Sequence, residues 1–123
     1  MKNLYLILFV SLFGNTYGQS LSSKLDDYTW IATAGSVTAY INFEAIYDGA
    51  STGALVIWTN VNGCMSSYTY NVSGNTVDAK FYQNTCGVSA SNQSFTYNSS
   101  TNSLSMSMNG RTQTYYAKTK RKP

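Results

Sequence analysis

The stretch GALVIWTNVNGCMSSYTYNVSGNTVDAKFYQNTC, residues 53–86, decides the fold of this chain. It holds two apolar runs with Asn62-Gly63 between them, a third alternating run, and the only two cysteines, Cys64 and Cys86. Asn-Gly is a strong signal for a two-residue hairpin turn, because both turn positions need a positive φ. The stretch therefore predicts an antiparallel β-meander to which the other strands are added.

The two cysteines flank one predicted hairpin of this meander, since Cys64 opens a strand and Cys86 follows the next one. An oxidised pair would close a loop of roughly 20 residues, which the chain-entropy model values at about 3 kcal/mol. The alternative is a pair of free, buried thiols. The amino terminus favours the disulfide, because it points to an oxidising compartment.

Residues 1–18 have the layout of a secretory signal peptide. Lys2 supplies a positive charge, an apolar run follows from Leu4 to Phe13, and small residues lie near a cleavage point after Gly18. The run is shorter than the roughly 20 residues of a membrane-spanning helix, so we expect no transmembrane segment. We predict a secreted, extracellular protein with one β-barrel domain at 19–118 and a basic tail at 119–123.

From Asp26 onward the pattern is that of an all-β protein, with apolar and polar residues alternating and Gly, Asn and Ser clusters recurring. Helical periodicity is not seen after the leader, and the sole proline is Pro123. Sequential strands with short links favour an up-and-down antiparallel meander, closed or nearly closed into a barrel. A two-sheet β-sandwich is the alternative. The eight predicted strands are about 27–33, 37–46, 54–60, 64–72, 76–83, 93–98, 103–108 and 111–118.

The third predicted strand, Ala54-Leu55-Val56-Ile57-Trp58, is apolar on both faces. Most strands of this chain have one polar face, as expected where one side of a sheet meets water. The segment before Asp26 would cover the outer side of this strand, or the strand would form a homodimer contact.

Trp30 lies early in the first predicted strand, in the sequence Tyr28-Thr29-Trp30, and Arg111 opens the last. With eight strands behind a signal peptide, this resembles the calycin superfamily of lipocalin-like barrels. Tyr28 stands where lipocalins have a glycine. The resemblance implies that Arg111 stacks over Trp30 and closes the base of the barrel.

The charges do not indicate a nucleic-acid partner. The chain has eight basic and five acidic residues, but Lys118, Lys120, Arg121 and Lys122 belong to its end. The folded body is therefore slightly acidic, whereas a nucleic-acid surface gathers basic residues on one face. The tail is expected to be a solvated end, with a weak anchor to an anionic surface and proteolytic trimming as alternatives.

Histidine is absent, which excludes Ser-His-Asp and Cys-His nucleophilic sites and the usual zinc ligand sets. Asp26 and Asp27 are adjacent, so in an extended chain they point to opposite sides and cannot flank one substrate bond. Glu44 and Asp48 lie on either side of a predicted strand end, and both should face solvent. We therefore expect no enzyme activity, no catalytic residue, no metal and no cofactor.

Aromatic residues are the unusual feature, with 11 tyrosines in the chain. Aromatic walls with a few hydroxyls suit a small apolar or aromatic ligand. Alternatively, these side chains fill the barrel, since eight strands enclose space only for side chains or for one small ligand. By strand parity, the interior ligand-binding candidates are Trp58, Tyr68, Tyr70, Phe81, Tyr97 and Met106.

Three Asn-X-Ser sequons make Asn71, Asn92 and Asn98 glycosylation candidates. In a chain this rich in Asn, Ser and Thr, chance matches are expected, so the signal has low specificity.

Two functions remain open from the sequence. The first is a secreted, non-enzymatic binding protein that holds a small hydrophobic or aromatic ligand in the barrel interior. The second is a secreted structural or interaction module, for example an adhesive, matrix or effector domain, that acts through its tyrosine-rich surface. An open pocket lined by Trp58 and Tyr70 would favour the first function, and a filled interior the second.

Overall fold

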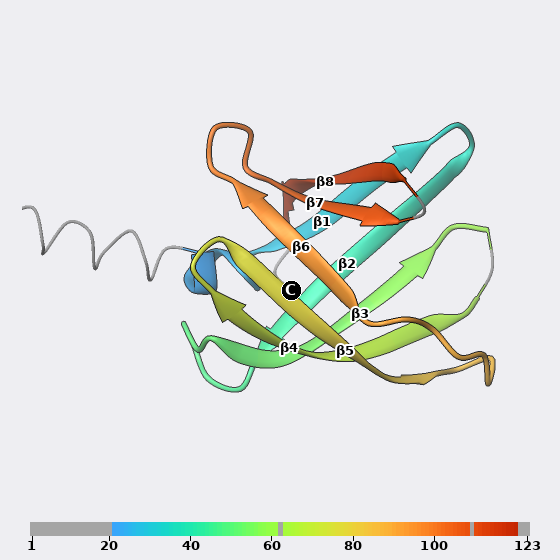
Figure 1. Cartoon of the computed structure of the whole chain (residues 1–123), viewed down its shortest axis with the longest axis horizontal. Helices are drawn as coiled ribbons and strands as arrows, with labels where there is room; N and C mark the ends of the chain where they lie inside the picture. The colour runs from blue at the N-terminus through green and yellow to red at the C-terminus, as the bar shows by residue number, and fades with distance from the viewer. Residues whose placement is uncertain (1–20, 62, 109, 121–123) are drawn as a thin grey trace, which may run out of the picture.

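The structure is a computed structural model that describes residues 21–61, 63–108 and 110–120. It confirms the all-β prediction: eight antiparallel strands follow one another around a closed barrel, and β8 pairs with β1 to complete it (Figure 1). The predicted signal peptide and the last three residues of the predicted tail lie outside the described residues.

The observed strands match the predicted ones to within two residues at each end. The pattern is readable because side chains alternate between the core and water along each strand. The strands are β1 Tyr28–Ala34, β2 Val37–Ala45, β3 Thr52–Thr59, β4 Met65–Ser73, β5 Thr76–Asn84, β6 Gln93–Asn98, β7 Ser103–Met108 and β8 Arg111–Thr119.

Turns between neighbouring strands use residues that tolerate a left-handed backbone. Gly74 joins β4 to β5 with φ at 60°, and Asn102 precedes β7 with φ at 49°. Gly110, which follows Asn109 in the sequence and directly precedes β8, has φ at 77°. These conformations strain most side chains but not glycine, and asparagine tolerates them, so the turns fix the strand order.

The barrel has two different ends. The helix end, where β1 begins and β2 ends, carries a short helix at 21–25 whose Leu21 and Leu25 are buried in the core. The disulfide end, where β1 ends and β2 begins, carries the bond between Cys64 and Cys86, with Cα atoms 5.5 Å apart. In Figure 1 the turns of the disulfide end lie on the right.

Residues 21–25, the described part of the segment before Asp26, do not cover the outer side of β3, because Leu21 and Leu25 enter the end of the barrel instead. The described part of this segment therefore does not provide the predicted cover of the third strand. On the outer face of β3, Val56 and Trp58 are half-buried and Ala54 is exposed. Disulfide formation is typical of oxidising compartments, which agrees with an extracellular location.

Candidate functional site

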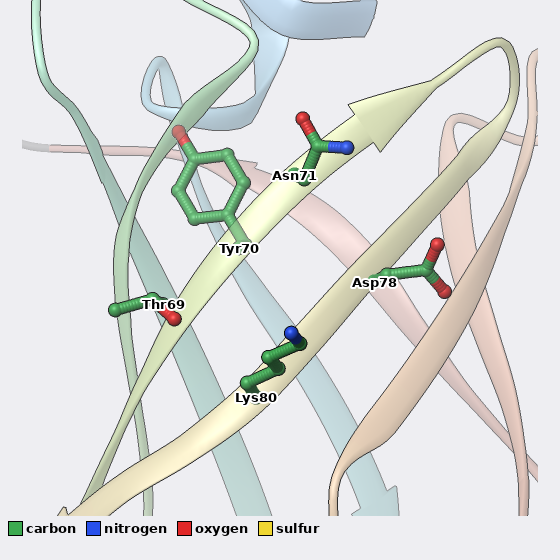
Figure 2. Close-up of a pocket in the computed structure, with 5 residues that line it drawn as sticks. All are labelled: Thr69, Tyr70, Asn71, Asp78 and Lys80. Carbon is green, nitrogen blue, oxygen red and sulfur yellow. The ribbon is translucent and has the colours of Figure 1, made fainter.

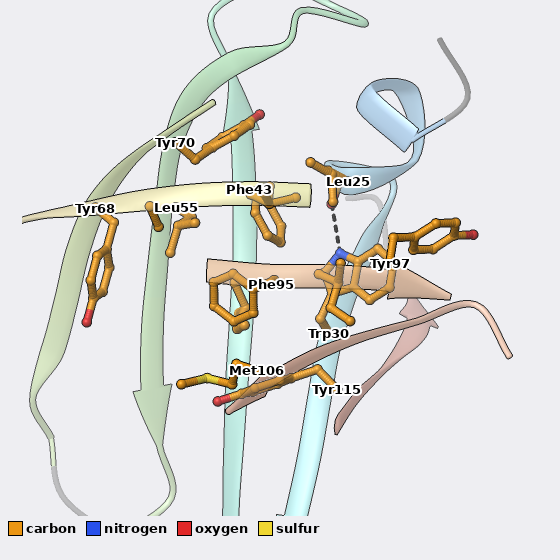
Figure 3. Close-up of a cluster of buried hydrophobic side chains, with 14 of the residues drawn as sticks. Leu25, Trp30, Phe43, Leu55, Tyr68, Tyr70, Phe95, Tyr97, Met106 and Tyr115 are labelled. Atoms are coloured by element: carbon orange, nitrogen blue, oxygen red, sulfur yellow. Dashed lines mark hydrogen bonds between the residues drawn. The ribbon is translucent and has the colours of Figure 1, made fainter. Parts of the chain in front are cut away.

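Five of the six interior candidates do lie inside the barrel. The rings of Tyr68 and Phe81 pack edge to face at 5.6 Å, and Tyr70 packs in the same way on Phe43 at 5.1 Å. Figure 3 shows Tyr68, Phe43 and Phe95 among the buried side chains between the strands of the barrel. The interior candidates are thus in contact with the core: Tyr68, Tyr70, Tyr97 and Met106 are buried, and Phe81 is half-buried.

Trp58, in contrast to the prediction, lies on the outer face of β3. Leu55 is fully buried and Ile57 packs against the core, so these two side chains take the inward positions of β3. Side chains of a strand alternate, and Trp58 therefore lies on the outer surface. Its ring stacks there on Tyr40 of β2, with centroids 5.2 Å apart and planes 16° from parallel.

The predicted pair of Trp30 and Arg111 does not form. Trp30 is fully buried at the helix end, where its strand neighbour in β8 is Ala117. Arg111 is exposed at the opposite end of β8, six residues and thus roughly 20 Å along the strand. Trp30 packs instead edge to face on the rings of Tyr28, Tyr97 and Phe43, at 5.8, 6.3 and 6.4 Å. The ammonium of Lys24 lies 5.8 Å from the centre of the Tyr97 ring.

A row of large outward side chains crosses five strands, and we call it the aromatic row. Tyr116 of β8 pairs with Ile31 of β1, Ile31 with Tyr40, Tyr40 with Trp58, and Trp58 with Met65 of β4. Neighbouring strands lie about 4.8 Å apart, so the row extends for roughly 19 Å around the barrel. The residue types of this row can be read from the sequence. The register between the strands, which aligns these residues, cannot.

A polar groove lies on the outer face of β4 and β5, with a volume of about 390 Å³ (Figure 2). Two cross-strand pairs line it, Thr69 with Lys80 and Asn71 with Asp78. The hydroxyl of Ser94 in β6 donates a hydrogen bond to Asp78 at 3.0 Å. Tyr70 also borders the groove, although Figure 2 shows its hydroxyl directed toward the segment that precedes β1.

The buried hydroxyl of Tyr70 and Oδ1 of Asp26 have no hydrogen-bond partner within the part of the chain that the structure describes. Burial raises the pKa of Tyr70 from 10.0 to about 12, and the negative charge of Asp26 adds to the rise. Both effects disfavour the phenolate. Tyr70 therefore stays protonated at neutral pH and acts as a packing residue with an uncompensated polar group.

Two further tyrosines, Tyr68 of β4 and Tyr115 of β8, are buried inside the barrel. Burial, followed by the interaction with Tyr68, raises the pKa of Tyr115 to about 12. Burial also raises the pKa of Tyr68, while a hydrogen bond with Gln93 lowers it. Both hydroxyls are thus held in the neutral form inside the barrel.

The three sequons occupy different settings. Asn71 lies on β4 in the groove, and Oδ1 of Asn92 accepts a hydrogen bond from the backbone N–H of Phe81 at 2.9 Å. Asn98 is exposed before the β6–β7 turn, where its Oδ1 accepts the N–H of Ser100 at 2.9 Å. All three asparagine side chains are exposed, so each sequon stays a candidate for glycosylation.

Comparison with protein-family models, curated proteins and solved structures finds no match. Across the described ranges, no helix is long and apolar enough to cross a membrane. Within the same ranges, no three His, Cys, Asp or Glu side chains gather closely enough to hold a metal ion.

Proposed function

We propose that the protein is a secreted, non-enzymatic adhesive module that binds an oligosaccharide chain along the outer face of β2–β5. The observation that carries the proposal is the continuity between the aromatic row and the groove. Trp58 in the row and Ala54 beside the groove are outward residues of β3, four residues or about 13 Å apart. Ala54 pairs with Thr69, which lines the groove.

An oligosaccharide has the chemistry that this surface would recognise. Sugar rings present C–H faces, which pack on aromatic and aliphatic side chains, and hydroxyl groups, which donate and accept hydrogen bonds. Tyr40, Trp58 and Val56 supply the apolar part of the surface. The groove supplies a hydroxyl, an amide, a carboxylate and an ammonium group, so it offers both donors and acceptors within a few ångströms.

The filled centre of the barrel supports an exterior site over an interior one. Trp30, Phe43, Phe95 and Leu55 are almost completely buried there, and an eight-stranded barrel has little space beyond its own side chains. A small apolar ligand would have to displace this packing. Secretion is supported by the leader pattern of the sequence and by the disulfide. The absence of histidine from the sequence supports a binding role without catalysis.

The test is calorimetric titration of the oxidised protein with a panel of neutral and charged oligosaccharides. Trp58→Ala and Asp78→Ala should each weaken binding of a responding sugar by about tenfold or more, because each removes a contact at one end of the surface. Tyr47→Ala is the matched control, since Tyr47 is 68% exposed on the β2–β3 turn and belongs neither to the lining of the groove nor to the aromatic row.

The proposal fails if no oligosaccharide binds, or if all three variants bind alike. A homodimer through β3 would bury the same surface. Light scattering that shows a dimer broken by Trp58→Ala, together with no sugar binding, would assign the face to a second copy of the chain.

A further inference from the structure

The two ends of the barrel differ sharply in charge. The helix end carries Lys24, Asp26 and Asp27 before β1, Asp48 in the β2–β3 turn, and Lys118 near the end of β8. The turns of the disulfide end, residues 35–36, 60–64, 85–92 and 109–110, contain no charged residue in their sequence. Arg111, the first residue of β8, is the charged side chain next to them.

Exposed apolar side chains gather at this uncharged end. Val61 in the β3–β4 turn is 65% exposed and Val88 in the β5–β6 turn is 60% exposed. Val37, at the first position of β2, is 40% exposed, and Met65 and Tyr82 are exposed near the strand ends. A single exposed apolar residue is ordinary. An uncharged end with exposed apolar residues on two turns and at the start of β2 is an arrangement typical of a docking surface.

The three turns are tied to one another. Asn60 accepts the N–H of Thr38 at 2.8 Å and donates to the carbonyl of Ser36 at 3.1 Å, which joins the β3–β4 turn to the β1–β2 hairpin. The disulfide joins the β3–β4 turn to the β5–β6 turn. The turns next to these exposed side chains are therefore connected to one another before any partner arrives, which lowers the entropic cost of docking.

We propose that the disulfide end docks into the interfacial layer of a zwitterionic lipid bilayer, with Val61, Val88 and Val37 as the inserting side chains. The turns extend from separate strand pairs at one end of the barrel (Figure 1), and a fluid plane can meet all of them at once. A protein partner would need a matching pocket for each. No carboxylate at this end repels lipid phosphates, and Arg111 is placed to pair with one.

The test is flotation of the oxidised protein, produced from the full-length gene, with phosphatidylcholine vesicles. The protein should float with the vesicles. Val61→Asp and Val88→Asp should each lower the partition coefficient by about tenfold, because each puts a charge at the lipid contact. Ile46→Asp is the matched control: Ile46 is 69% exposed on the helix end, and its replacement should leave flotation unchanged. Circular dichroism establishes that each variant is folded.

Three results would overturn this inference. The first is the absence of flotation with phosphatidylcholine. The second is flotation that needs phosphatidylserine and disappears when residues 119–123 are deleted, since this would assign binding to the basic tail. The third is a dimer in lipid-free solution that Val61→Asp dissociates, since this would assign the surface to a second copy. None of these results bears on sugar binding at the outer face of β2–β5.

Discussion

The indole N–H of Trp30 donates a hydrogen bond to the carbonyl oxygen of Leu25 at 3.0 Å, and both side chains are fully buried (Figure 3). This bond fastens the short helix at 21–25 to the first strand and closes the helix end of the barrel. The ring of Trp30 also packs edge to face on Phe43 at 6.4 Å. The role that a lipocalin-like barrel would give to a late arginine is thus taken by the segment before β1.

Trp30→Phe should lower the free energy of unfolding by about 3 kcal/mol, because it leaves the Leu25 carbonyl without its partner and opens a cavity. Urea unfolding followed by circular dichroism measures the change. Trp58→Phe is the matched control at the surface and should cost less than about 1 kcal/mol. Equal losses in the two variants would contradict the assignment of Trp30 to the core.

Tyr70→Phe should leave the protein equally stable or stabilise it by up to about 2 kcal/mol at pH 7. The reason is that the substitution keeps the ring packed on Phe43 but removes a buried hydroxyl that lacks a partner in the described structure. Thermal unfolding measures the effect. A clear loss of stability would mean that the hydroxyl has a favourable interaction at the helix end.

Alkali should unfold the protein as the pH rises from about 10 toward 12. The pKa values of Tyr70 and Tyr115 are raised from 10.0 to about 12 in the folded state, so the folded chain holds these protons more tightly than the unfolded chain. The contribution of these two tyrosines to stability is complete below their pKa in the unfolded chain. It is lost as the pH rises through their pKa in the folded chain.

Tyrosinate absorbance recorded together with circular dichroism tests this expectation. The buried tyrosines should ionise in the same step in which the β-sheet signal is lost. A single absorbance transition near pH 10.0, with the β-sheet signal unchanged, would contradict the raised pKa values.

Gly53→Ala should destabilise the protein by about 1–3 kcal/mol through overpacking. A Cβ at Gly53 would lie 2.7 Å from Cα of Ala45 and 2.9 Å from the ring of Tyr70, and it would overlap the carbonyl oxygen of Glu44. These atoms belong to neighbouring strands and the core, so they cannot move aside easily. Gly63→Ala is the control. The prediction of a two-residue turn at Asn62-Gly63 was wrong, because β3 ends at Thr59, β4 begins at Met65, and Gly63 does not have the positive φ of such a turn. A Cβ at Gly63 meets nothing within 4 Å, so the melting temperature should change little.

The sequence predicted the eight strands well because alternation and Gly or Asn turns are local signals. It misplaced Trp58 because β3 is apolar on both faces. Without alternating polar residues, the strand gives no sign of which side chains face outward. The sequence misplaced Arg111 because the partner of Trp30 depends on the register between β1 and β8, which sets Ala117 beside it. The aromatic row and the groove were likewise not predictable, since both depend on cross-strand register.

The most direct test of an exterior binding site on a filled barrel is fluorine NMR of protein labelled with fluorotryptophan. The chain has two tryptophans, one in the core and one in the aromatic row, so two signals are expected. Trp58→Phe assigns them. A bound oligosaccharide should shift the Trp58 signal and leave the Trp30 signal in place. A small apolar compound that shifts Trp30 while Trp58 stays unchanged would contradict the account and return the binding site to the barrel interior.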